Sequence, residues 1–151
     1  MSKRVLLLVL VILVSTMELP AASAKRPVVI ISAAQAKNFG LPNESPFWTP
    51  TQKQISLLES LLPLFLKSNP PKYDKPVSNP LDYGCQYVGV TKNGEKLIFL
   101  NAFCPSFIAE TSNKYWFKQR VMVLDGGSCF FHVYFNPRTN KFSGLQYNGV
   151  A

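Results

Sequence analysis

The fold is decided by residues 120–149, which read RVMVLDGGSCFFHVYFNPRTNKFSGLQYNG. Three runs in this stretch are rich in β-branched and aromatic residues, and we expect each to form a strand: 120–124, 130–135 and 142–147. Between them, residues 125–128 hold two glycines, which adopt positive φ at little cost. Residues 136–140 hold a proline and two asparagines, which favour chain reversal. The pattern predicts three consecutive strands joined by tight turns.

A hairpin is predicted upstream of this unit, where two strand-like runs, 83–90 and 96–103, flank the pair Asn-Gly at 93–94. Asn-Gly between two such runs is a strong hairpin signal, because both residues accept the positive φ of a type I′ turn. Closing that turn places Lys92 opposite Glu95 and sets the register of both strands.

One amphipathic helix is predicted before the first hairpin. Residues 49–52 supply a capping hydroxyl on Thr49, a proline at the first helical position and a glutamine three residues after the cap. Apolar residues recur at helical spacing and define a broad face: Ile55, Leu58, Leu62 and Phe65, widened by Leu57, Leu61 and Leu64. The side chains expected to point outward are those of Lys53, Gln54, Ser56, Glu59 and Ser60. Pro63 predicts a kink, and Asn69-Pro70 ends the helix.

Residues 1–24 have the pattern of a secretory signal peptide. Lys3 and Arg4 precede an unbroken apolar run over 5–14, and residues 22–24, Ala-Ser-Ala, form a small-x-small cleavage site. That run is much shorter than the ~20 residues needed to span a bilayer. We therefore expect cleavage after Ala24 and an exported protein, periplasmic or secreted.

The rest of the chain is predicted to hold one α+β domain over 49–151, preceded by an extended or irregular segment over 25–48. In that segment the apolar run 28–31 is too short to distinguish an added edge strand from an extended leader. One helix followed by about five antiparallel strands predicts a helix packed on a meander sheet. This layering is cystatin-like in outline, a likeness of architecture that carries no function.

Cysteine positions favour one disulfide over a metal site. The spacings among Cys85, Cys104 and Cys129 match no zinc motif. The predicted hairpin register places Cys85 opposite Ala102, with Cys104 diagonal on the same face. We expect a Cys85–Cys104 disulfide and a free Cys129, because the turn at 125–128 lies at the opposite end of a simple meander. Three buried thiols are the alternative.

No catalytic residue is predicted. His132 is the only histidine, and a lone histidine on an apolar strand is usually packed and hydrogen-bonded. Cys129 lies three positions away from it, which on a strand places the two side chains on opposite faces. The carboxylates are widely separated, so no acid–base pair is apparent. We expect no metal and no cofactor.

A candidate binding loop lies within and just after residues 104–119. Aromatic and basic side chains are interleaved there: Phe107, Tyr115, Trp116, Phe117, Lys118 and Arg120. Such a mixture can stack on rings or peptide groups while the cations meet anions. The alternative is that the aromatic side chains cover an open edge or end of the sheet.

Several motifs resemble those of a group of small uncharacterised exported bacterial proteins. They are W-T-P-T-Q at 48–52, L-P-L-F-L at 62–66, V-x-V-L-D-G-G-S at 121–128, F-F-x-V-x-F-N-P at 130–137 and F-x-x-L-x-Y-N-G-V-A at 142–151. The resemblance covers most of the chain from about residue 48 onward. It implies an exported single domain and no particular activity.

The net charge of +8 favours anionic surroundings. Since the basic residues are scattered, an ordinary solvated surface is favoured over a dedicated patch. Nucleic acid is disfavoured as a partner, and an anionic envelope component or another protein are the alternatives. The leading hypothesis is an exported, non-enzymatic binding or interaction module. A small thiol-dependent hydrolase and a structural protein of the cell envelope are the alternatives.

Overall fold

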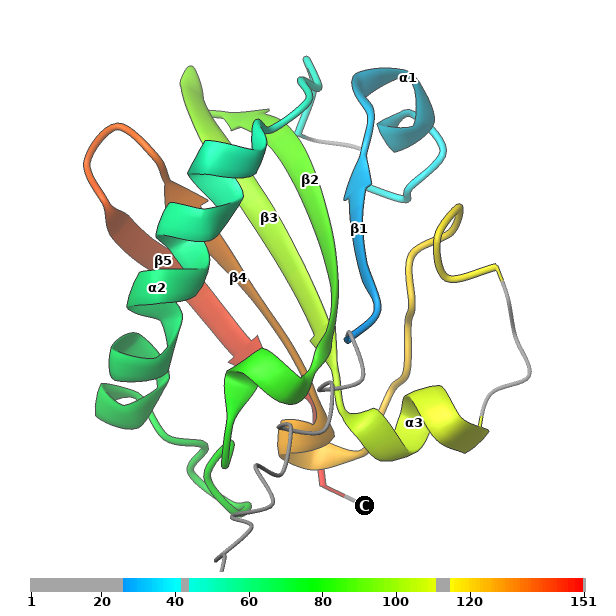
Figure 1. Cartoon of the computed structure of the whole chain (residues 1–151), viewed down its shortest axis with the longest axis vertical. Helices are drawn as coiled ribbons and strands as arrows, with labels where there is room; N and C mark the ends of the chain where they lie inside the picture. Colours follow the sequence, from blue (N-terminus) through cyan, green and yellow to red (C-terminus); the bar gives the residue numbers. More distant parts are fainter. Residues whose placement is uncertain (1–25, 42–43, 111–114, 151) are drawn as a thin grey trace, which may run out of the picture.

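The computed structural model describes residues 26–41, 44–110 and 115–150 (Figure 1). The predicted signal peptide, 1–24, lies outside the described residues. The elements in chain order are β1 (Val28–Ile31), α1 (Ala33–Ala36), α2 (Gln52–Ser68), the 3₁₀ turn η1 (Pro80–Asp82), β2 (Gly84–Lys92), β3 (Glu95–Phe103), α3 (Pro105–Glu110), the 3₁₀ turn η2 (Gly127–Cys129), β4 (Phe130–Asn136) and β5 (Lys141–Tyr147). The chain is of the α+β class, as predicted.

The strands form one five-stranded mixed sheet in the order β1-β2-β3-β4-β5. β1 runs parallel to β2, and the other neighbouring pairs are antiparallel. The prediction of a wholly antiparallel meander is therefore wrong at one edge. The strand predicted at 120–124 is wrong too, because those residues are not part of the sheet. The run at 28–31, for which two alternatives were open, supplies the fifth strand.

The hairpin predicted from Asn-Gly is confirmed. Lys92 pairs with Glu95, and the register continues without a break to Gly84 and Phe103. The turn residues have φ of 52° at Asn93 and 78° at Gly94, which is the positive φ that a type I′ turn requires. The longest pair of strands in the sheet is thus set by a local signal.

A β-bulge interrupts the pairing of β4 with β5. His132 pairs with Gln146 and Tyr134 with Ser143, so two residues of β5 lie opposite the single residue between His132 and Tyr134. Gly144, with φ of 61°, is one of the two. The extra residue resets the alternation of β5 and brings three apolar side chains to the same core: Phe142, Leu145 and Tyr147.

α2 packs on one face of the sheet, which we call the inner face; the opposite face is the outer face. Figure 1 shows α2 lying across the strands. The buried residues of α2 are Ile55, Leu58, Leu62 and Leu66. They meet the buried inner-face side chains of β2, β3 and β4, among them Tyr87, Leu100 and Val133. This core follows the helical period that the sequence predicts.

The N-cap of α2 is Thr51 and not Thr49, so the predicted cap is wrong by two residues. The Thr51 hydroxyl accepts from the backbone N–H of Gln54, and the Gln54 side chain returns to the backbone of Thr51. Thr49 Oγ1 instead accepts from the backbone N–H of Ala33, 3.0 Å away. Its hydroxyl therefore joins the start of α1 to the segment that leads into α2.

Two residues of α2 face the opposite way from their prediction. Leu64, expected on the buried face, is 71% exposed. Glu59, expected to point outward, is partly buried and accepts a 2.7 Å hydrogen bond from the Tyr87 hydroxyl. It also forms an ion pair with Arg26. The reason is tertiary: Arg26 lies just before β1, beside α2, and supplies the positive charge that the carboxylate needs when it is partly removed from water.

The outer face has a second, smaller core. It consists of Ile31, Ala36, Phe39, Leu41, Val88, Val90, Leu97 and Phe99. Its cover comes from α1 and the residues that follow it, which belong to the segment predicted as extended or irregular. α1 has its own capping box between Ser32 and Gln35. Both faces of the sheet are thus covered near β1 and β2.

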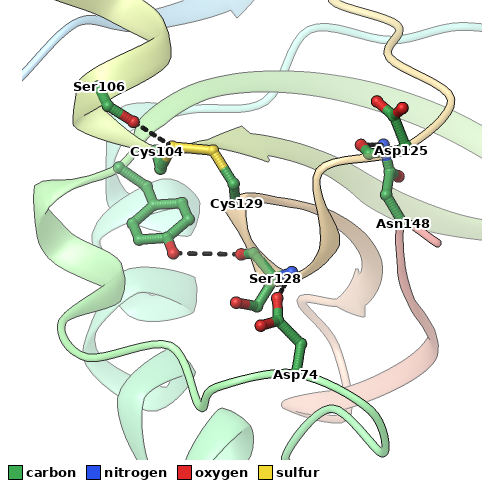
Figure 2. The surroundings of a disulfide bond; sticks show 8 residues. Asp74, Cys104, Ser106, Asp125, Ser128, Cys129 and Asn148 are labelled. Carbon is green, nitrogen blue, oxygen red and sulfur yellow. Dashed lines mark hydrogen bonds between the residues drawn. A yellow bond between two sulfur atoms is a disulfide. The ribbon is translucent and has the colours of Figure 1, made fainter. Parts of the chain in front are cut away.

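The disulfide joins Cys104 to Cys129, with their Cα atoms 4.8 Å apart (Figure 2). The predicted Cys85–Cys104 pair is wrong, and Cys85 is the free, buried cysteine. The error follows from the strand order: without a strand at 120–124, β4 pairs directly with β3. Phe103 then pairs with Phe130, and the two cysteines are the next residues beyond that pair.

Candidate functional site

The predicted binding loop continues into an extended segment over the outer face, and we call residues 115–126 the outer strap. It starts with a turn, in which the N–H of Lys118 donates to the carbonyl of Tyr115 at 2.8 Å. In Figure 1 the strap descends, from yellow to orange, on the side of the molecule away from α2. Its place in the fold makes it the cover of the outer face near α3.

Two buried amide side chains hold the first half of the strap. Gln86 on β2 and Asn101 on β3 are directly paired across the sheet, and the Asn101 amide donates to Gln86 Oε1 at 2.8 Å. Gln86 Oε1 also accepts from the backbone N–H of Val121 at 3.0 Å, and Asn101 donates to the Val121 carbonyl at 2.9 Å. The Gln86 side-chain nitrogen, Nε2, donates to the carbonyls of Trp116 and Gln119. The hydrogen bonds that a neighbouring strand would offer to the strap backbone are thus supplied by the side-chain amides of Gln86 and Asn101.

The second half of the strap is held near the C-terminus. The Asn148 amide donates to the carbonyls of Val123 and Asp125, the latter at 3.0 Å (Figure 2). The N–H of Gly127 donates to the carbonyl of Gly149 at 2.9 Å. The disulfide at Cys129 follows directly. The strap is thus fixed at both ends of its extended part.

Asp74 braces the turn that follows the strap (Figure 2). Its Oδ2 accepts from the backbone N–H of Ser128 at 2.6 Å, and this bond lowers the pKa of the Asp74 carboxyl. A Cβ at Gly127 would overlap the same carboxylate, and Gly126 and Gly127 both have positive φ. A Cβ at Gly126 would likewise lie 2.7 Å from the Phe130 ring, so glycine is required by conformation and by space at both positions.

The six predicted loop residues divide into two groups. Phe107 packs edge-on between Phe103 and Phe130, with ring centroids 5.7 and 5.0 Å away. Trp116 meets Phe103 at 6.0 Å, and the guanidinium of Arg120 lies 5.0 Å from the Phe99 ring. These three side chains cover the outer face of the sheet, whereas the alternative interpretation expected aromatic side chains at an open edge or end.

The other three predicted residues are exposed. Tyr115 is 62% exposed and Phe117 39%, and the Lys118 ammonium lies 5.4 Å from the Phe117 ring centre. The sequence analysis did not single out the two most exposed apolar side chains of the strap, which are Met122 at 73% and Leu124 at 98%. Their signal was visible in the run V-M-V-L at 121–124. Every position is apolar there, so an extended chain must show two of them to solvent.

A second candidate site is a charged cluster where the β2–β3 hairpin meets β4 and β5. The Tyr134 hydroxyl donates to Glu44, and burial together with that carboxylate raises the pKa of Tyr134. Lys92 Nζ lies 3.8 Å from Glu44 and 4.4 Å from the centre of the Tyr134 ring. A pocket of about 430 Å³ opens beside Lys92 and Tyr134. Two buried atoms of the cluster, Glu44 Oε2 and Arg120 Nε, have no hydrogen-bond partner among the described residues.

His132 lines the same pocket and is a partly buried, packed histidine. Its ring lies 5.4 Å from Phe99. Burial and the neighbouring positive charge of Arg120 lower the pKa of His132, and a hydrogen bond with Gln146 acts in the opposite direction. The imidazole is therefore mostly neutral at pH 7. The bulge at Gly144 is what allows Ser143 and Gln146, three positions apart on one strand, to line this pocket together.

Thiol chemistry finds little support in this arrangement. Cys85 is buried beneath α2, and burial raises its pKa to about 11. At pH 7 roughly 1 thiol in 10⁴ would then be the reactive thiolate. The guanidinium of Arg26 lies 3.4 Å from the sulfur but does not overcome the burial. The other two cysteines are joined to each other.

Comparison of the chain with protein-family models, with curated proteins and with solved structures finds no match in any of the three. Among residues 26–41, 44–110 and 115–150, no three His, Cys, Asp or Glu side chains come together as a metal site would require. Within the same ranges, no helix has the length and apolar character of a membrane span.

Proposed function

We propose that this protein is an exported, non-enzymatic binding module, and that the outer strap is its binding surface. One observation carries the proposal: the strap backbone is fixed by buried amides and a disulfide, yet Met122 and Leu124 point into solvent. Covering the sheet needs only the inward side chains of the strap. Large apolar groups that are held in place and exposed are typical of interaction sites.

Fixing the backbone before binding has an energetic advantage. A free loop loses conformational entropy when a partner orders it, and that loss reduces the affinity. Gln86 is completely buried, and its amide makes hydrogen bonds to Trp116, Gln119 and Val121. The strap has therefore lost much of its freedom already in the folded protein. Loops held on a rigid scaffold commonly carry binding functions for this reason.

The strap is preferred to the charged cluster because the cluster satisfies most of its own charge. Glu44 is paired with Lys92 and Tyr134, and Glu95 at the pocket rim is 3.6 Å from Arg138. A ligand entering there would have to compete with these contacts. The thiol-hydrolase alternative loses its nucleophile to burial and to the disulfide. No observation specifically favours a structural envelope role.

Three parts of the proposal rest on the sequence and on general architecture. Export is inferred from the pattern over residues 1–24. The likeness to small exported bacterial proteins supports the same inference. The cystatin-like outline rests on one long helix, α2, laid across a sheet, and the parallel strand β1 is an addition to that outline.

Photo-crosslinking in living cells that export the protein tests the proposal. In one variant a benzoylphenylalanine replaces Leu124. In the control variant it replaces Leu64, an exposed leucine of α2. We expect adducts with protein or lipid from position 124 and few or none from position 64, at equal secretion levels. Equal labelling from both positions, or none from position 124, would mean that the strap is not the binding surface.

A further inference from the structure

Residues 115–124 of the strap combine exposed apolar groups with positive charge, and the one acidic residue of the strap, Asp125, follows Leu124. Residues 115–124 read YWFKQRVMVL and contain no aspartate or glutamate; of their two basic residues, Lys118 is exposed and Arg120 packs over Phe99. The chain as a whole has a net charge of +8. A surface of this kind is complementary to a partner that is both anionic and able to accept apolar side chains.

The exposed apolar side chains of the strap fall into two pairs along the chain. Met122 and Leu124 are two positions apart on an extended chain, so they project to the same side roughly 7 Å from each other. Tyr115 and Phe117 lie at the turn where the strap begins, and Lys118 follows them. The surface therefore consists of two aromatic rings at the turn and two apolar side chains further along the strap, with Lys118 between them in the sequence.

We infer that the outer strap docks the protein on an anionic lipid surface, an inference that rests on the proposed function. Met122 and Leu124 enter between the headgroups, the rings of Tyr115 and Phe117 lie at headgroup level, and Lys118 pairs with lipid phosphate. A stable protein interface buries about 800 Å² and some 20–30 residues on each partner. A bilayer surface needs only a few inserted apolar groups together with basic residues. Four apolar side chains in one ten-residue segment fit the second requirement better.

Vesicle sedimentation with the full chain tests this inference. The vesicles are phosphatidylcholine alone, or phosphatidylcholine with 30% phosphatidylglycerol, at low salt and at ~0.5 M NaCl. The strap variant is Met122→Ser with Leu124→Ser. Its matched control is Leu64→Ser with Tyr73→Ser, which removes an exposed leucine (71%) and an exposed tyrosine (76%) elsewhere on the surface. All four positions are exposed, and cooperative thermal unfolding confirms that each variant is folded.

We expect the parent and the control to bind the phosphatidylglycerol vesicles alike, and the strap variant to bind on the order of tenfold or more weakly. Lys118→Gln should weaken binding about fivefold and reduce its dependence on salt. Leu124→Trp, which adds an interfacial aromatic, should strengthen it.

Two results would overturn the inference. In the first, the strap variant and the control bind equally, which would mean that scattered surface charge accounts for the binding. In the second, the parent does not bind anionic vesicles at all. The crosslinking experiment then decides separately on the proposed function: protein adducts from position 124 would retain a binding module with a protein partner, and no adducts would reject both.

Discussion

Replacing Gln86 by leucine should detach the outer strap from the sheet. The leucine keeps the approximate volume and the buried position but removes every polar atom of the side chain. The groups it leaves behind are the N–H of Val121, the carbonyls of Trp116 and Gln119, and one donor of Asn101. A buried polar group left without a partner costs about 1–3 kcal/mol.

The expected loss of stability is about 3 kcal/mol, which is less than the sum over four groups. The strap lies at the surface, so its carbonyls can turn toward water when the anchor is lost. The cost is then divided between global stability and local detachment. Urea unfolding with linear extrapolation measures the first part, and a loss of this size would lower the midpoint by about 1–3 M. Amide hydrogen exchange at residues 119–123 measures the second.

Gln52→Leu serves as the matched control, since Gln52 is exposed at the first position of α2. It should change the free energy of unfolding by less than about 0.5 kcal/mol. A double-mutant cycle with Asn101→Leu should show strong coupling, because the two amides share Val121. If Gln86→Leu is as stable as the parent and its strap amides remain protected, then the buried amides do not hold the strap and the reasoning fails.

Three further predictions concern the rest of the fold. Replacing Cys104 and Cys129 together by alanine should cost about 3 kcal/mol, from the freedom regained by the unfolded chain across a separation of 25 residues, and it should make stability insensitive to dithiothreitol. Leu62→Ala should cost about 2–5 kcal/mol in chemical unfolding, against less than about 0.5 kcal/mol for Leu64→Ala; equal losses would contradict the placement of α2. Because the pKa of His132 is lowered in the folded state, its neutral form stabilises the fold above the ordinary value of 6.5, and that stability falls as the pH drops below it. His132→Gln should flatten the pH dependence of the unfolding midpoint below about pH 6.5, and an unchanged slope would contradict the assignment.

The sequence predicted correctly those elements whose formation depends on residues close together in the chain. The Asn-Gly pair defines the β2–β3 hairpin because positive φ at two successive residues has few alternatives. The apolar period of α2 is equally local. The bulge in β5 was not predicted, although it has a local signal: Phe142, Leu145 and Tyr147 are spaced three and then two residues apart, which an uninterrupted strand cannot bring to one face.

The errors arose where two local structures were both compatible with the sequence and contacts with distant residues decide which one forms. Thr49 and Thr51 are each followed three residues later by glutamine, so both fit a capping box. The backbone of Ala33 occupies the first hydroxyl and leaves the second to the helix. No pattern within residues 49–54 contains that information.

The strand predicted at 120–124 failed for a similar reason. Its residues are as suited to a strand as those of β4, but buried amides from β2 and β3 bind its backbone over the outer face. Because 120–124 is not a strand of the sheet, β4 pairs directly with β3, and the disulfide partner of Cys104 is Cys129 instead of the predicted Cys85. The candidate site was predicted in part for the same reason: the loop was recognised, but its outward side chains depend on which face of 120–124 is held down.

The disulfide has a further consequence for the export that we propose, because it closes residues 104–129 into a covalent ring. The outer strap lies inside this ring. A protease that cuts one peptide bond between the two cysteines would leave both fragments joined, with β3 and β4 still paired at the junction. A molecule nicked in this way would migrate as a single species until it was reduced. The segment that we propose to meet the outside is therefore one that can be cleaved once without the protein coming apart.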